Sequence, residues 1–170
     1  MAASGRQERA WVRGAQSGSA SDLEALFRAH WPRAFRAAYL VVHDAAAAED
    51  IAQEAFVSAV RRLDRFDGRR RFGPWLHRIV VNRAIDWARA RALRRETELF
   101  DDAALAGPAP DRDDRLRAGI ARLSPDHRAV IVLRYVLEYT PGEIAGLLDL
   151  PRGTVNSRLR RALDQLQDEL

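Results

Sequence analysis

The sequence predicts an all-α protein made of two small helical domains joined by a flexible linker, the second domain being a four-helix unit. Along most of the chain, apolar residues recur at spacings of three and four, which is typical of helices with one buried face. That pattern stops at an acidic stretch that contains Gly107-Pro108-Ala109-Pro110. A chain of 170 residues is long enough for two small domains, each with a modest core.

Charge is distributed unevenly along the chain, although the net charge is only +4. All 28 basic residues are arginine. Residues 61–95 contain 12 arginines and three acidic residues, whereas residues 96–114 contain seven acidic residues and one arginine. This segregation indicates contacts with a polyanion in the basic segment.

Several classes of protein are disfavoured by what the sequence lacks. The absence of cysteine excludes disulfides, thiolate metal sites and cysteine nucleophiles. His30, His43, His77 and His127 have no metal-ligand spacing, and no phosphate-binding glycine loop is present. We therefore expect no enzyme, no catalytic residue, no metal site and no cofactor. Without a signal peptide or a membrane span, the expected location is the cytoplasm, with no membrane insertion.

The first domain is predicted to cover residues 7–95, after a disordered start at residues 1–6. A short helix at residues 7–16 is followed by a capping box at Ser21 and Glu24. Pro32 either kinks the next helix or divides it in two. The buried stripe expected in this segment is Leu23, Leu26, Phe27, Trp31, Ala34, Phe35, Ala38 and Val42.

The next predicted helix is capped by Asp44 and runs to about Leu63. Its expected core stripe is Ala48, Ile51, Ala52, Ala55, Phe56, Ala59 and Leu63, and its outward residues are Glu49, Asp50, Gln53, Glu54 and Val57. An acidic face of this kind is either simply solvated or binds a basic protein partner. The strongly basic segment that follows favours a surface divided between protein and nucleic acid.

Turn chemistry at Asp67-Gly68 and three consecutive arginines then lie between Phe66 and Phe72. Aromatic rings that stack on unpaired bases and arginines that hold phosphates would suit single-stranded DNA. Alternatively the rings fill the core, which we prefer for Phe72 and Trp75, while Phe66 fits both readings equally.

A helix is predicted from Pro74 to about Arg95. Its expected core stripe is Leu76, Ile79, Val80, Ala84 and Trp87, and its expected outward face is Arg78, Asn82, Ile85, Asp86 and Arg89. Arg83 falls on the buried side and needs an acidic partner. Residues 96–113 are the predicted acidic linker.

The second domain is predicted to cover residues 114–170. Ser124 caps one of its helices. Thr140, Pro141 and Glu143 form the start of another, and a turn at Asp149-Leu150-Pro151 leads to a last helix that begins near Arg152. In that helix Val155, Leu159, Ala162, Leu163 and Leu166 form one stripe, opposite Gly153, Thr154, Ser157, Arg160 and Arg161. This pattern favours helix-turn-helix DNA binding over a solvated amphipathic helix.

Three segments in this order resemble the extracytoplasmic-function group of bacterial RNA polymerase sigma factors, from about residue 7 to the C-terminus. They are DAAAAEDIAQEAFVSAVRRL from Asp44, FDGRRRFGPWLHRIVVNRAIDWAR from Phe66, and LSPDHRAVIVLRYVLEYTPGEIAGLLDLPRGTVNSRLRRAL from Leu123. The resemblance implies that residues 7–95 correspond to sigma region 2 and residues 114–170 to sigma region 4.

The resemblance also implies roles for individual residues. Contact with the clamp helices of the largest polymerase subunit is assigned to Asp50, Gln53, Glu54 and Phe56. Binding of single-stranded DNA at the minus-ten element is assigned to Phe66, Asp67, Gly68, Arg69, Arg70, Arg78, Asn82, Asp86 and Arg89. Binding at the minus-thirty-five element is assigned to Arg152, Thr154, Asn156, Ser157, Arg160 and Arg161.

Further partners follow from the same resemblance. The second domain is expected to contact the flap of the second-largest subunit, the linker to pass through the active-site and RNA-exit channels, and an anti-sigma factor to cover the polymerase-binding surfaces. The chain departs from the family at Asp149, where glycine is usual, and in its more basic loop. The rival interpretation is a stand-alone regulator that binds duplex DNA and uses its first domain for dimerisation or ligand sensing.

Overall fold

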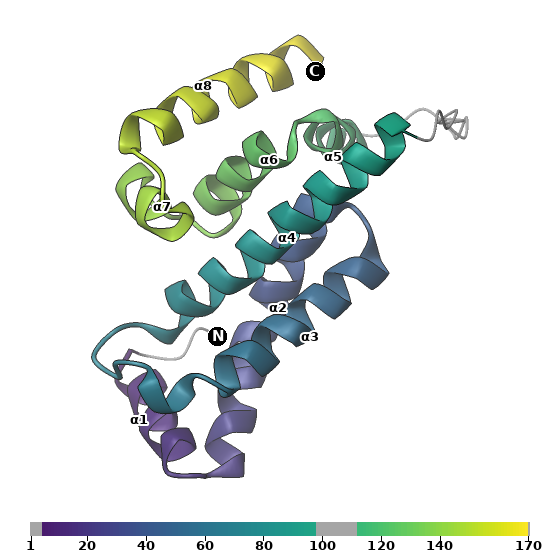
Figure 1. Cartoon of the computed structure of the whole chain (residues 1–170). Helices are drawn as coiled ribbons and strands as arrows, with labels where there is room; N and C mark the ends of the chain where they lie inside the picture. The colour runs from purple at the N-terminus through teal and green to yellow at the C-terminus, as the bar shows by residue number, and fades with distance from the viewer. Residues whose placement is uncertain (1–4, 98–111, 170) are drawn as a thin grey trace.

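The computed structural model describes residues 5–97 and 112–169, which are helical apart from short connections (Figure 1). We call α1–α4 the first helical unit and α5–α8 the second. In chain order the elements are α1 (Gly5–Gln16), α2 (Ala20–Val42), α3 (Ala45–Val60), the 3₁₀ turn η1 (Leu63–Arg65), α4 (Phe72–Thr97), α5 (Arg112–Arg122), α6 (Pro125–Ile131), the π-helical turn η2 (Val132–Val136), α7 (Pro141–Leu148) and α8 (Arg152–Glu169). The described residues form no strand, which confirms the all-α prediction.

Local capping signals determine where several helices begin. Asp44 and Ser124 each accept the backbone N–H of the residue three positions ahead, at 3.0 and 3.3 Å. Before α7, Thr140 Oγ1 accepts the Glu143 N–H at 3.3 Å, and the Glu143 carboxylate accepts the Thr140 N–H at 2.8 Å. Each contact satisfies an amide that has no partner inside its helix. The predicted caps of α3, α6 and α7 are therefore confirmed.

The start of α2 differs from the prediction. Ser19, rather than Ser21, provides the cap by accepting the Asp22 N–H at 3.3 Å, so Ser21 lies inside the first turn. Pro32 lies within one helix that runs from Ala20 to Val42 and does not divide it. Helix α1 begins at Gly5, two residues earlier than predicted. The disorder expected at residues 1–6 is wrong for Gly5 and Arg6, which belong to α1, and residues 1–4 lie outside the described residues.

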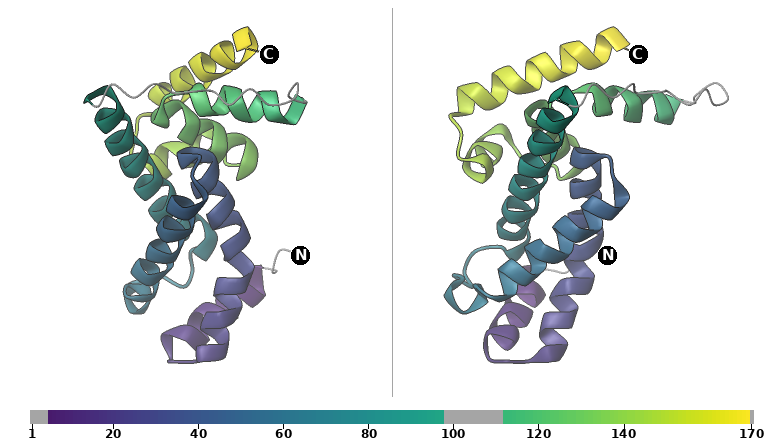
Figure 2. Two further views of the ribbon diagram at one scale, coloured as in Figure 1. Left: turned by 90° about the vertical axis from the view of Figure 1, so that its right-hand side faces the viewer. Right: turned by 45° about the vertical axis from the view of Figure 1, so that its right-hand side comes forward.

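Helix α4 of the first unit packs against α2 and α3 of its own unit and also against α6 and α7 of the second unit (Figures 1 and 2). Leu76, Val80 and Ala84 are buried as predicted. Ile85 is buried too, although the sequence placed it on the outward face. The reason is that α6 and α7 of the second unit pack on that side of α4, a long-range contact that the helical period does not reveal.

The second unit has the predicted four helices, with η2 continuing directly from α6. The stripe of α8 is buried at Val155, Leu159, Ala162 and Leu166. Leu163 was predicted to belong to it but is exposed. Hydrophobic residues of both units form one continuous core, so the two helical units pack against each other.

The predicted linker overlaps both flanking helices, because α4 extends to Thr97 and α5 begins at Arg112. The rest of that prediction concerns residues 98–111, which are outside the described part of the chain. Within the described part, every helix is too short or too polar to span a membrane.

Candidate functional site

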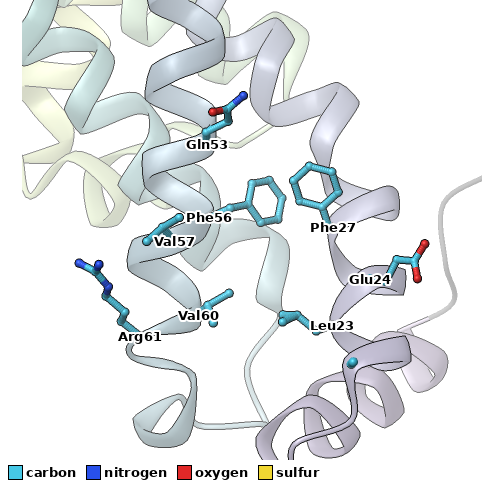
Figure 3. Close-up of a pocket in the computed structure, with 9 residues that line it drawn as sticks. Leu23, Glu24, Phe27, Gln53, Phe56, Val57, Val60 and Arg61 are labelled. Atoms are coloured by element: carbon cyan, nitrogen blue, oxygen red, sulfur yellow. The ribbon is translucent and has the colours of Figure 1, made fainter.

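An apolar groove of about 670 Å³ lies between α2 and α3 (Figure 3). The Phe27 ring of α2 and the Phe56 ring of α3 both line the groove and contact each other at a tilt of 56°, with centroids 4.9 Å apart. Phe27 was predicted to be buried but is 40% exposed, because part of its ring lines the open groove. The groove is large enough for bulky side chains of a partner. Its other lining residues include Leu23, Val57 and Val60.

An acidic and polar rim borders the groove on α3. A neighbouring hollow of about 560 Å³ is lined by Asp50, Gln53 and Glu54. These are three of the four residues of this chain that were predicted to contact the polymerase. The fourth, Phe56, is only 6% exposed and reaches the surface only as a wall of the apolar groove. Arg83 lines the same hollow and pairs with Glu54 at 2.6 Å, which supplies the acidic partner that the sequence required.

The loop between η1 and α4 is held by its own aspartate. Asp67 Oδ1 accepts the Arg69 backbone N–H and the Arg69 Nε–H, both at 3.1 Å. The Arg70 N–H donates to the Asp67 carbonyl at 2.9 Å and closes a turn. The two hydrogen bonds from Arg69, first the one from its side chain, lower the pKa of Asp67. The exposed arginines are thus presented on an ordered turn.

Aromatic side chains pack beside this turn. Phe66 and Trp75 lie with centroids 4.5 Å apart. Phe66 is 8% exposed and Phe72 is buried, so both help to fill the core. A hollow of about 450 Å³ remains, and its lining residues are Arg62, Arg65, Phe66, Asp67, Arg70 and Trp75. Arg62, Arg65 and Trp75 were not among the predicted site residues, although all three flank the loop in the sequence.

Three of the four outward polar residues of α4 lie against the second unit. Arg78 lines a hollow of about 520 Å³ together with Gly146 and Leu147 of α7. Asn82 Nδ2 donates to the Arg78 carbonyl at 2.8 Å and reaches the Leu147 carbonyl at 3.4 Å. Asp86 is exposed. The remaining member, Arg89, pairs with Asp126 of α6 at 2.6 Å.

The turn between α7 and α8 contains Asp149, which stands where the family usually has glycine. Asp149 has φ 55° and ψ 49°, the left-handed conformation that aspartate tolerates better than most residues. Helix α8 then begins at Arg152, and its first turns carry the residues predicted to bind duplex DNA. Arg152, Asn156, Arg160 and Arg161 are exposed, whereas Thr154 and Ser157 are half-buried and joined by a hydrogen bond of 2.9 Å. The structure thus brings all six together along the exposed side of α8.

Arg152, Arg160 and Arg161 form no ion pair with any residue that the structure describes. Free guanidinium groups on an exposed helix can reach base edges or phosphates without first breaking a contact.

Two known protein families match parts of this chain. The Sigma-70 region 2 family matches residues 26–94, and the Sigma-70 region 4 family matches residues 113–166. SigW of Bacillus subtilis, an ECF RNA polymerase sigma factor, is 31% identical over 80% of this chain and 82% of its own length. The RNA polymerase sigma factor CarQ of Myxococcus xanthus is 32% identical over 91% of this chain and 92% of its own.

Solved structures show the same fold. CnrH, determined in complex with the cytosolic domain of CnrY, is 28% identical with a TM-score of 0.72, covering 95% of this chain and 96% of that chain. The sigma factor RpoE of Bartonella quintana, determined with the anti-sigma factor NepR, is 22% identical with a TM-score of 0.71, covering 86% and 95%.

Proposed function

The chain belongs to the sigma-70 family, in the extracytoplasmic-function group of RNA polymerase sigma factors, and from this membership we propose how its surfaces divide the work. Sigma factors direct the polymerase core to promoters and are not themselves catalysts. We propose that α3 and the groove beside it bind the core, that the arginine turn with α4 holds the opened minus-ten strand, and that α8 reads the minus-thirty-five duplex.

The observation that supports this division is that acidic and basic side chains lie on different surfaces. Helix α3 presents Asp50 and Glu54 next to an apolar groove. The turn at residues 67–71 and the start of α8 present arginines instead. Acidic and apolar surface together suit a basic amphipathic partner, and guanidinium groups suit phosphate and guanine. The hollow walled by Phe66 and Trp75 offers an aromatic surface to an unstacked base.

The finer assignments follow the same division. We propose that residues 7–95 act as sigma region 2 and residues 114–170 as sigma region 4, with the flap of the second-largest subunit as a further contact of the second unit. We propose that an anti-sigma factor regulates the chain by competing for the groove between α2 and α3. A polymerase subunit acts where the chromosome is, so the proposed location is the cytoplasm.

Transcription with purified components tests the proposal. We expect the chain and core polymerase together to start transcripts at a promoter that neither component recognises alone, and mapped start sites to share two upstream elements. A stand-alone regulator would instead bind a duplex operator tightly as a dimer without polymerase, and would give no transcript with it.

Replacing Arg160 tests the role of α8. If its guanidinium makes a bidentate contact with guanine, Arg160→Ala should weaken binding to the minus-thirty-five element by about 1–3 kcal/mol. Fluorescence anisotropy with cognate and scrambled duplexes measures this effect, with Gln167→Ala on the same helix as the control. An equal loss on both duplexes would reassign Arg160 to phosphate contact.

A further inference from the structure

One carboxylate lies at the junction of the two helical units. Asp126, in the first turn of α6, accepts hydrogen bonds from two arginines. Arg89 of α4 donates through Nη2 to Oδ1 at 2.6 Å and through Nε to Oδ2 at 3.3 Å. Arg158 of α8 donates to Oδ1 at 2.8 Å. Asp126 is 25% exposed, so water screens these contacts less than those of a fully exposed pair.

The geometry at Arg89 is the one that arginine adopts with a phosphate. Two N–H groups of one guanidinium point at two oxygens of one anion, as they do in bidentate phosphate binding. Arg89 is also one of the residues that we propose to hold the minus-ten strand. Its guanidinium cannot form this two-point contact with Asp126 and with a DNA phosphate at the same time.

Other contacts also hold the second unit against α4 and α2 of the first unit. The His77 Nδ1 and Tyr139 hydroxyl atoms are 2.7 Å apart, and Asn82 reaches the Leu147 carbonyl. Arg128 donates to the Val41 carbonyl of α2. The second unit therefore occupies the side of α4 that carries the proposed strand-binding residues, as the position of α6 and α7 beside α4 illustrates (Figure 1).

We propose that Asp126 is an intramolecular competitor of promoter DNA, which holds Arg89 and keeps the strand-binding side of α4 covered in the free chain. This inference rests on the proposed function. A polymerase that binds the two units at separate places would pull Arg89 and Asp126 apart and expose Asn82 at the same time. The free chain then binds the strand weakly because only its minor, open population is competent.

Asp126→Asn keeps the size of the side chain and removes its charge. We expect the variant, without polymerase, to bind a fluorescent single-stranded minus-ten oligonucleotide about tenfold more tightly than the wild type, since the apparent affinity scales with the open fraction. In the complex with core polymerase, the two proteins should bind the same oligonucleotide equally. Asp126→Ser, which retains a residue suited to the start of a helix, repeats the measurement if the first variant is unstable.

The control is another carboxylate at the junction of the units. Glu138 lies 3.9 Å from Arg33, an arginine without a proposed DNA contact. Glu138→Gln should leave the affinity for the oligonucleotide within about twofold, because an exposed pair of this kind contributes little.

A second measurement detects separation of the two helical units in the absence of DNA. Since the chain has no cysteine, dyes can be attached to cysteines introduced at Ala46 of α3 and Gln167 of α8, both exposed. Asp126→Asn should lower energy transfer between them, and Glu138→Gln should not. Unchanged transfer or unchanged strand affinity in Asp126→Asn overturns the proposal. Failure of the proposed function is distinguishable, because it shows as absence of transcription by the wild-type chain with core polymerase.

Discussion

Reversing the charge of Glu54 is expected to abolish stable binding to core polymerase while leaving the protein folded. Placing an arginine against a basic partner surface costs several kcal/mol, which corresponds to at least a ~100-fold loss of affinity. The pair that Glu54 forms with Arg83 has side chains that are 66% and 40% exposed. Such a pair contributes less than about 1 kcal/mol to folding. Affinity measured by anisotropy and the urea midpoint measured by circular dichroism separate these effects.

Two further variants sharpen this test. The double variant Glu54→Arg/Arg83→Glu restores an ion pair with the opposite orientation, so it should recover any lost stability without recovering polymerase binding. Glu49→Arg introduces the same charge on the same helix at an exposed position outside the proposed contact. We expect it to reduce affinity less than about tenfold, as for a charge outside the contact. If Glu49→Arg and Glu54→Arg were equally damaging, net charge rather than a defined contact would explain the loss.

Local features of this fold were predictable because they depend on residues a few positions apart. The caps at Asp44, Ser124 and Thr140 each need one side chain and an amide three residues ahead. The stripe predicted for α3 follows the helical period, and all seven of its members are buried, although α3 ends at Val60 and Leu63 lies in η1. The exception at α2 is informative, because Ser19 and Ser21 both suit a cap and sequence alone does not decide between them.

Features that depend on contacts between distant segments were not predictable. Ile85 is covered by helices that follow it by at least 40 residues in the sequence. Phe27 has the spacing of a core residue, yet it remains 40% exposed on the groove, although its ring contacts Trp31 and Phe56. The partner of Arg89 likewise comes from the second unit. The sequence thus predicted which face of each helix is buried, but it did not predict that the second unit packs over α4.

Acid is expected to destabilise the chain through His77. This side chain is 4% exposed at the junction of α4 and the segment before α7. Its Nε2 has no hydrogen-bond partner among the described residues. Burial, followed by repulsion from His30 and Arg33, lowers the pKa of His77 from 6.5 to about 4. The folded protein therefore keeps His77 neutral at pH values where the unfolded chain has protonated it.

The sign of the effect follows from proton binding. Between pH 6.5 and 4 the unfolded state binds more protons than the folded state at this site, so the free energy of unfolding rises with pH. The stability is fully present above pH 6.5 and falls by up to ~3 kcal/mol as the pH decreases towards the folded pKa, at about 1.4 kcal/mol per pKa unit. Urea midpoints measured from pH 7.5 to pH 4.5 should show this slope.

Variants at the same contact identify the titrating group. His77→Gln removes the imidazole, so its stability should depend less steeply on pH than that of the wild type. Tyr139→Phe removes the hydroxyl 2.7 Å from His77 Nδ1 but keeps the imidazole buried, so it should lower stability at every pH and retain the slope. Burial also lowers the pKa of His43 to about 4, and a residual slope in His77→Gln is therefore expected. A slope identical to that of the wild type would exclude His77 as a source of acid sensitivity.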